Sequence, residues 1–229
     1  MEYLHNGFTL ALCPGAFPLS TDSMALGSFA RLPKAAKVLD LGSGCGTLGL
    51  LLCARDGLCQ VTGVELSQQA HAMALENIAR NGLDGRMVSI CADLKTIPQA
   101  FPRGGFSVCV SNPPYFSAGA VRAGQENARH EGQCKPEDLF ASAAWALKYG
   151  GDFYLVHKPQ RLAQLLTLGD KYGMACKRLC LLRHSPDTLP DVVLLAFRKG
   201  GKPGLTLEEI CLRDGQGEFT QAYREIYHL

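Results

Sequence analysis

The sequence predicts an α/β fold in which a mostly parallel sheet is covered by helices on both faces. Short apolar segments alternate with helical segments from about residue 36 to residue 200, a pattern typical of strand–helix–strand units. A glycine-rich turn joins the first of these strands to its helix. Four successive strands each end at a polar side chain: Asp40, Glu65, Asp93 and Asn112. Because ligands bind at the carboxyl ends of parallel strands, we expect these four side chains to share one site.

The composition predicts one large domain of ordinary charge. The chain has 229 residues, of which 47% are hydrophobic and 19% are charged, and its net charge of +2 demands neither nucleic acid nor a membrane. We see no secretory signal and no apolar run of membrane-spanning length, so we expect a cytoplasmic location. The ten cysteines form no pairs with zinc spacing, which predicts reduced thiols and no metal site.

Residues 1–35 are expected to form an irregular hairpin followed by a helix. The first 20 residues are apolar with Gly and Pro, and a helix is predicted from the polar cluster Ser20, Thr21 and Asp22 to about Arg31. A residue of this cluster could simply cap the helix. Alternatively the cluster lines a cofactor pocket, and both interpretations stay open at this point.

A glycine loop follows the first strand of the main sheet. The strand covers about residues 36–41, Gly42, Gly44 and Gly46 follow, and a helix is predicted from Thr47. Glycines at alternate positions allow a tight turn and a close approach of the backbone to a ligand. The helix N-terminus adds free N–H groups, so the loop is a candidate ligand site.

The same loop also matches a second, weaker pattern. Gly44, Gly46 and Gly49 have the spacing of the dinucleotide fingerprint, which would indicate a nicotinamide-dependent oxidoreductase. In that motif the first glycine ends the strand, whereas here Gly42 does so. Asp40 also brings a carboxylate to the loop, and a carboxylate suits a cationic amino-acid group better than it suits a pyrophosphate.

The next two strands lead to acidic residues. The strand over residues 59–65 ends in Glu65, a position suited to binding two ribose hydroxyls, although an ordinary strand-end charge is the simpler alternative. Ser67 is expected to cap a helix that ends at Asn81. The strand over residues 87–92 leads to Asp93, which either accepts a hydrogen bond from an adenine amino group or only starts the next turn.

The fourth strand leads to Asn112, Pro113, Pro114 and Tyr115. The two prolines stiffen this loop, and each pushes the residue before it toward extended geometry. The Asn112 side-chain oxygen and the Pro113 carbonyl can then each accept one N–H of a planar amino group. Tyr115 can stack on the ring that carries this group. The alternative is a Pro-Pro turn that closes the strand, with Tyr115 packed at its rim.

The segment after this motif is expected to cover the acceptor pocket. Residues 117–133 are polar and rich in glycine, and loops of this length are often functional. Arg129 either contacts a substrate phosphate or is an ordinary surface arginine.

The remaining residues are predicted to complete the sheet. A helix over about residues 136–148 leads to a strand over residues 152–157, and Pro159 opens a helix that ends near Gly173. Residues 175–183 and 192–199 are expected to form a hairpin. Residues 201–229 are expected to form a small appendage packed on the domain.

Positive charge is concentrated near the end of the sheet. Residues 171–202 contain seven Lys or Arg against two Asp. This concentration predicts either a patch that contacts phosphates or an ordinary solvated basic face.

Taken together, these motifs resemble those of class I S-adenosylmethionine-dependent methyltransferases of the N6-adenine type. Within that class the chain is similar to the bacterial tRNA1(Val) adenine-37 N6-methyltransferases of the methyltransferase small domain group. The similarity extends over roughly residues 7–200. It rests on residues 40–46, Val64-Glu65, Ala92-Asp93 and Asn112–Tyr115, with further resemblance at Ser20–Met24 and Ala128–Glu131.

The resemblance implies a Rossmann-like class I methyltransferase fold. Such a fold has a seven-stranded, mostly parallel sheet with an antiparallel last strand and helices on both faces. Residues 36–200 would form the methyltransferase domain, and residues 1–35 would contribute to its cofactor pocket.

The resemblance also implies roles for the residues of the site, with S-adenosylmethionine as the cofactor. The residues expected to bind it are Thr21, Asp22, Asp40, Gly42, Gly44, Gly46, Glu65, Leu66, Asp93 and Asn112. The glycine loop and Asp40 would hold the methionine part, Glu65 the ribose and Asp93 the adenine. The acceptor amine would lie against the catalytic residues Asn112, Pro113 and Tyr115, and the substrate would contact Pro114, Tyr115, Phe116 and Arg129.

The acceptor remains open among several classes. We expect an RNA, most simply a tRNA, because the chain has little room for a separate DNA-recognition domain. The alternatives are rRNA, DNA, a protein glutamine, a binding module without catalysis, and the oxidoreductase, which leaves Asn112–Tyr115 unexplained. We further expect a monomer or weak dimer with no membrane partner.

Overall fold

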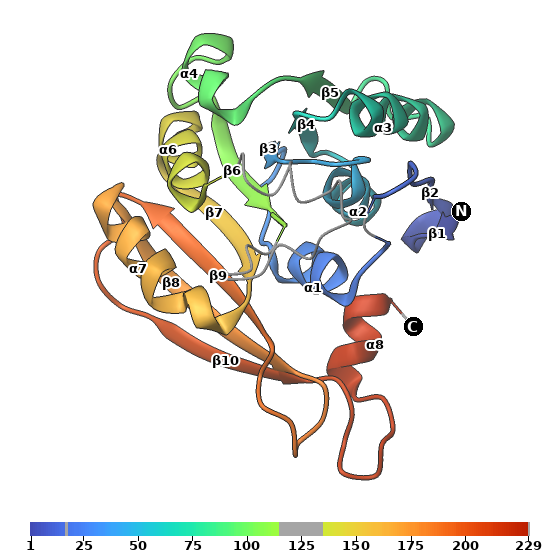
Figure 1. Ribbon diagram of the computed structural model, residues 1–229, viewed down its shortest axis with the longest axis vertical. Coiled ribbons are helices and arrows are strands. Elements are labelled where there is room, and N and C mark those ends of the chain that lie inside the picture. Colours follow the sequence, from blue (N-terminus) through green and yellow to red (C-terminus); the bar gives the residue numbers. More distant parts are fainter. Residues whose placement is uncertain (17, 115–134, 229) are drawn as a thin grey trace, which may run out of the picture.

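The computed structural model describes residues 1–16, 18–114 and 135–228. An eight-stranded sheet runs through the molecule in the order β10-β8-β9-β7-β6-β3-β4-β5, and helices lie on both of its faces (Figure 1). The strands of this sheet are β3 (Lys37–Leu41), β4 (Gln60–Glu65), β5 (Met87–Cys91), β6 (Phe106–Ser111), β7 (Leu147–His157), β8 (Met174–Arg183), β9 (Val192–Lys199) and β10 (Thr206–Cys211). A separate short hairpin pairs β1 (Glu2–Tyr3) with β2 (Thr9–Leu10).

Two helical layers enclose the sheet. One layer contains α1 (Thr21–Phe29), α2 (Thr47–Arg55), α3 (Gln68–Arg80) and α8 (Gln221–Tyr227), and the other contains α4 (Ile97–Ala100), α6 (Pro136–Ala146) and α7 (Leu162–Lys171). Successive strand residues point to opposite layers: Val38 packs in the first core and Leu39 in the second. Both faces of the sheet are therefore buried, which explains the nearly continuous apolar character of its strands.

The strand directions bring the predicted site together. Strands β3, β4, β5, β6 and β7 are parallel, and β9 alone runs antiparallel, between β7 and β8. This arrangement confirms the predicted mostly parallel sheet with an antiparallel last strand. The carboxyl ends of β3, β4, β5 and β6 consequently meet at one edge.

The prediction of seven strands was one strand short. The appendage contributes β10, which pairs in parallel with β8 from Thr206 opposite Arg178 to Cys211 opposite Arg183. Without β10, β8 would be an open edge with unpaired backbone groups. The Arg178 guanidinium also donates to both carboxylate oxygens of Glu208, at 2.6 and 2.9 Å. Two adjacent glutamates interrupt the alternation of apolar and polar residues in this segment, so its sequence did not predict a strand.

The boundary after α6 also differs from the prediction. The helix expected to reach residue 148 ends at Ala146, and the strand expected from residue 152 begins at Leu147. The reason is an irregularity in pairing: Phe106 lies opposite Leu147, but Val108 lies opposite Asp152. Residues 148–151 form the resulting bulge. Because two of them are glycines, which are uncommon inside strands, the sequence pattern did not predict a strand there.

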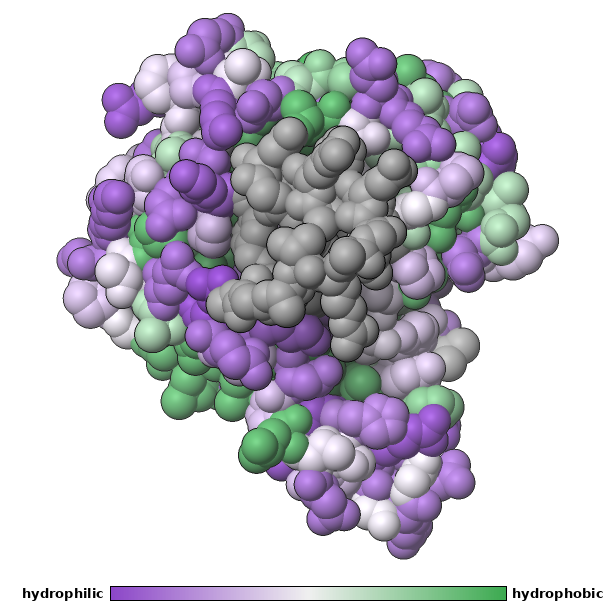
Figure 2. Space-filling model, in the orientation of Figure 1, coloured by the Kyte–Doolittle hydropathy of each residue, from purple (hydrophilic) through white to green (hydrophobic). Residues whose placement is uncertain are grey.

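One face of the molecule can be compared with the polarity expected of a surface. Hydrophilic side chains predominate on the face drawn in Figure 2, with hydrophobic residues scattered among them. In the described ranges, no helix combines the length and apolarity that crossing a bilayer requires.

Candidate active site at the carboxyl edge of the sheet

A pocket of about 520 Å³ opens at the edge where the parallel strands end. Its walls come from the β3–α2 loop, the ends of β4, β5 and β6, the N-terminal segment and the starts of α1 and α6. Most of the predicted site residues line it: Asp22, Asp40, Gly42, Gly44, Glu65, Leu66, Asp93, Asn112, Pro113 and Pro114. The predicted residues Tyr115, Phe116 and Arg129 lie outside the described residues.

The glycine loop needs its first two glycines for their backbone conformation. Gly42 and Gly44 have φ values of +74° and +55°, which other L-residues rarely adopt. The N–H groups of Gly42 and Ser43 both donate to the Val64 carbonyl, at 2.9 and 3.1 Å. These bonds tie the loop to the end of β4 and leave an open pocket over the glycines.

Gly46 and Gly49 have a packing role instead. Gly46 begins α2 with φ +89° and is not part of the pocket wall. A Cβ at Gly49 would lie 2.4 Å from the Met87 methyl carbon, and one at Gly46 would lie 2.9 Å from it. Two of the three glycines that resemble the dinucleotide fingerprint, Gly46 and Gly49, thus allow the close packing of α2 against Met87 of β5.

Asp40 is a carboxyl group buried within β3. Only 1% of the residue is exposed, and among the described residues neither carboxylate oxygen has a hydrogen-bond partner. Burial, together with the nearby charge of Glu65, raises the pKa of Asp40 to about 8. A cationic ligand group in the pocket would favour the ionised form.

Glu65 is held in one orientation by backbone donors. Its Oε2 accepts from the Gly44 N–H at 2.8 Å, and its Oε1 accepts from the Ser67 N–H at 2.8 Å. Each oxygen retains a lone pair, so the carboxylate can accept two further hydrogen bonds from a ligand. Ser67 itself caps α3 as predicted, because its side chain accepts from the Ala70 N–H.

Asp93 starts a turn and also lines the pocket, while its contact with an adenine stays a prediction. Its Oδ1 accepts from the Lys95 N–H at 2.9 Å, which starts a 3-10 turn over Leu94–Thr96. The same residue lines the pocket. Starting a turn and facing a ligand are thus compatible at this position.

Asn112 follows β6 directly, and its side chain is anchored to α1. Its Nδ2 donates to the Ser23 Oγ at 2.8 Å, and β6 is tied to β3 by a bond from the Ser111 hydroxyl to the Leu41 carbonyl at 2.7 Å. Among the described residues no donor contacts the Asn112 Oδ1. Within those residues this acceptor oxygen is available to a ligand, and Asn112 lines the pocket.

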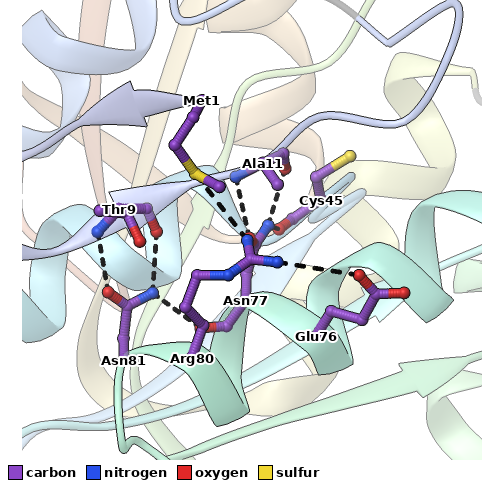
Figure 3. Close-up of polar contacts among 8 residues, drawn as sticks. All are labelled: Met1, Thr9, Ala11, Cys45, Glu76, Asn77, Arg80 and Asn81. Carbon is purple, nitrogen blue, oxygen red and sulfur yellow. Dashed lines mark hydrogen bonds and ion pairs between the residues drawn. The ribbon is translucent and has the colours of Figure 1, made fainter.

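The N-terminal segment forms one wall of the pocket, and two asparagines hold it, Asn77 within α3 and Asn81 at its C-cap (Figure 3). Asn77 accepts from the Ala11 N–H at 2.9 Å and donates to the Ala11 carbonyl at 2.8 Å. One turn later, Asn81 makes the same pair of bonds to Thr9, each at 2.8 Å. The two amides thereby replace a neighbouring strand, and the Asn77 amide also donates to the Cys45 carbonyl of the glycine loop at 2.9 Å.

Comparison with known proteins decides the family. The methyltransferase small domain family matches residues 20–174. This chain belongs to that family. The similar "tRNA1(Val) (adenine(37)-N6)-methyltransferase" of Tolumonas auensis is 32% identical over 91% of this chain and 87% of the relative. That of Cronobacter sakazakii is 31% identical over 95% of this chain and 91% of the relative.

A solved structure supports the same fold. A predicted O-methyltransferase from Agrobacterium tumefaciens superposes with a TM-score of 0.75 at 22% identity, covering 90% of this chain and 95% of that one. The family membership and this fold confirm the predicted class, an S-adenosylmethionine-dependent methyltransferase with a Rossmann-like class I fold.

The pocket of this methyltransferase fits the chemistry of the cofactor. S-adenosylmethionine carries an ammonium group and two ribose hydroxyls. The pocket offers a buried carboxyl at Asp40, whose oxygens have no hydrogen-bond partner in the described ranges, and a carboxylate with further lone pairs at Glu65. A cation and hydroxyl donors are the groups that such oxygens bind.

Two predicted features of the methyltransferase have other uses in the structure. Thr21 does not line the pocket, and its hydroxyl is hydrogen-bonded to the Tyr227 hydroxyl of α8 at 2.7 Å. The seven basic side chains of residues 171–202 largely stabilise the fold. Among them, Arg198 pairs with Asp152, Arg183 pairs with Glu209, and the Lys199 ammonium donates to two backbone carbonyls. Contact of this segment with phosphate stays a prediction.

The sequence analysis missed several residues of the methyltransferase site. Ser20 and Ser23 line the pocket at the start of α1, and Asp138 and Leu139 reach it from α6. Asn77 holds a pocket wall without being part of it. For Ser20 the sequence left a helix cap and a pocket residue as alternatives, and the structure shows that it caps α1 and also lines the pocket.

Proposed function

We propose that this methyltransferase transfers the methyl group of S-adenosylmethionine to the exocyclic N6 amine of an adenine in RNA, with a tRNA as the substrate. The observation that carries the proposal is the Asn112-Pro113 pair at the pocket, where an amide oxygen and a backbone carbonyl are available to a planar amine. Relatives that match nearly the whole chain are named for this reaction on tRNA1(Val).

In this proposal the cofactor spans the pocket from Asp40 to Asp93. Asp40 pairs with its ammonium group, Glu65 accepts from the ribose hydroxyls, and Asp93 accepts from the adenine amine. Gly42 and Gly44 leave room for its backbone contacts. The spacing of these groups along the carboxyl ends of β3, β4 and β5 supports the assignment.

The protein would act mainly by positioning the acceptor amine. The lone pair of an adenine amine is delocalised into the ring, so the amine is a poor nucleophile. Hydrogen bonds from its two N–H groups to the Asn112 Oδ1 and the Pro113 carbonyl favour a tetrahedral nitrogen. The same oxygens stabilise the positive charge that develops on the nitrogen. When bound, the cofactor supplies an electrophilic methyl group on a sulfonium.

The target base must leave its stack to enter this site. A single-stranded or loop adenine does so at the lowest free-energy cost, which favours a structured RNA with an exposed base. The oxidoreductase alternative is not favoured, because the matching family and the similar relatives are methyltransferases. The expected monomeric or weakly dimeric state and the cytoplasmic location stay predictions.

The proposal is tested by transfer of labelled methyl groups to unmodified tRNA, rRNA, genomic DNA and cytosolic protein in parallel. We expect N6-methyladenosine in tRNA and a loss of transfer in Asn112→Ala, whose affinity for S-adenosylhomocysteine should stay within about twofold of the wild type. Label in rRNA, DNA or protein would contradict tRNA as the substrate and would identify that other acceptor class instead. Equal losses of transfer and of cofactor affinity in Asn112→Ala would contradict the role of Asn112.

A further inference from the structure

Ser23 is the residue that contacts the Asn112 side chain. The bond from the Asn112 Nδ2 to the Ser23 Oγ measures 2.8 Å, and it connects residues 89 positions apart in the chain. Ser23 is 6% exposed, so water competes little for its hydroxyl. The amide therefore has one fixed partner on the side facing α1.

A second serine decides which way the Ser23 hydroxyl points. The Ser20 Oγ accepts from the Ser23 backbone N–H at 3.2 Å and lies 3.3 Å from the Ser23 Oγ. A serine hydroxyl has one proton. If Ser23 donates that proton to Ser20, its oxygen is left only as an acceptor, which matches the amino group that Asn112 presents to it.

We propose that Ser20 and Ser23 form a relay that sets the orientation of the Asn112 amide, so that its oxygen and not its amino group faces the acceptor amine. Ser23 is then a positioning residue, which acts through Asn112. This inference rests on the proposed function and extends it to two residues outside the Asn112–Tyr115 loop.

The orientation matters because the oxygen of an amide accepts hydrogen bonds, whereas its amino group donates them. With the oxygen toward the pocket, Asn112 accepts an N–H of the target amine. Rotated by half a turn, it would present a donor to a donor, and one of the two hydrogen bonds that activate the nitrogen would be lost. The relay disfavours the rotated orientation, in which the Asn112 amino group would face the acceptor amine.

The first test replaces Ser23 by alanine. The backbone N–H that Ser20 caps is retained, so the helix start is preserved. In single-turnover methyl transfer to unmodified tRNA, we expect Ser23→Ala to be about fivefold to tenfold slower, the value typical of one lost hydrogen bond. The dissociation constant for S-adenosylhomocysteine should stay within about twofold.

Two further variants serve as controls. Ser23→Thr keeps a hydroxyl and should restore at least half of the wild-type rate if it melts at the wild-type temperature. Ser28→Ala changes a serine of the same helix that does not line the pocket, and it should transfer at the wild-type rate.

A double-mutant comparison separates an effect on the orientation of the Asn112 amide from a general loss of structure around Ser23. In an Asn112→Asp background the side chain has two equivalent acceptor oxygens, so orientation no longer matters. There Ser23→Ala should change the residual rate by less than about twofold. A slowing in that background as large as in the wild type would mean that Ser23 acts on structure alone, and this would overturn the proposal.

The relay can also be detected without activity. In the free protein, the NMR signals of the Asn112 side-chain amide should show cross-relaxation to the Ser23 β-protons, and this should vanish in Ser23→Ala. A wild-type protein that shows these signals but methylates no acceptor would refute the proposed function and keep the relay. Absent cross-relaxation, or a wild-type rate in Ser23→Ala, would refute the relay itself.

Discussion

Asp40 illustrates how burial and a neighbouring charge change one carboxyl group. Its pKa is raised from 3.8 to about 8, first by desolvation and then by Glu65. The group is therefore protonated in the folded free protein near neutral pH but ionised in the unfolded chain. Its contribution to stability is complete below about pH 4 and is lost as the pH rises through about 8.

The raised pKa of Asp40 predicts a pH-dependent affinity for the cofactor. A cationic ammonium group binds the ionised carboxyl, so binding releases a proton below about pH 8. The dissociation constant for S-adenosylhomocysteine should rise as the pH falls from 8 to 6, by at most about tenfold per unit. Calorimetric titrations over this range test it, with Asp40→Asn as the control that should lose the slope. A flat profile in the wild type would contradict the assignment.

Asp40 and Glu65 should be separable by the part of the cofactor that each contacts. Methylthioadenosine has the ribose and adenine but no amino-acid group. We expect Asp40→Asn to weaken S-adenosylhomocysteine by about tenfold and methylthioadenosine hardly at all, since it removes one charged hydrogen bond. Glu65→Ala should weaken both ligands by about tenfold or more. Titrations in which Asp40→Asn weakens both ligands and Glu65→Ala weakens only S-adenosylhomocysteine would contradict these assignments.

Among the elements, α3 has a role beyond covering the sheet. Asn77 and Asn81 occupy successive turns of its inner side and bind the backbone of the N-terminal segment (Figure 3). Asn77 is fully buried and reaches the glycine loop as well. The helix therefore connects two walls of the pocket.

Replacing Asn77 by alanine should weaken both the fold and the cofactor site. The change leaves the backbone groups of Ala11 without their partners, at a cost of about 1–3 kcal/mol in the free energy of unfolding. Urea denaturation and titration with S-adenosylhomocysteine measure the two effects. Asn81→Ala, which releases Thr9 but not the glycine loop, is the matched variant and should leave cofactor affinity closer to the wild type. Equal affinities in both variants would show that the connection to the loop is unimportant.

At the scale of the whole molecule, the C-terminal segment closes the sheet and supports the site. β10 covers the edge of β8, and α8 packs beside α1 (Figure 1), where the Tyr227 hydroxyl is bonded to Thr21. The segment thus links the far edge of the sheet to the helix that carries Ser23.

Removing residues 205–229 should therefore expose β8 as an open edge. We expect a lower melting temperature and light scattering that grows with protein concentration, because unpaired edges associate. Tyr227→Phe, which removes only the hydroxyl contact, should cost about 0.5–1.5 kcal/mol without aggregation. A shortened chain that melts like the full one would show that β10 is dispensable.

The sequence by itself determined seven of the eight strands of the main sheet and many of the residues that line the pocket. Strand ends and glycine turns are local patterns, and the rule that parallel strands share a carboxyl edge brings Asp40, Glu65 and Asp93 together without further information. Family membership then confirmed the enzyme class that these motifs predict.

Only the tertiary structure decided the features that join distant segments. The pKa of Asp40 depends on burial from all sides, the Ser23–Asn112 bond spans 89 positions, and the Asn77–Ala11 bonds span 66. β10 became a strand because an open edge of β8 was available to it, against its own weak pattern. These features arise from neighbours that no local window contains, and for that reason periodicity and spacing could not predict them.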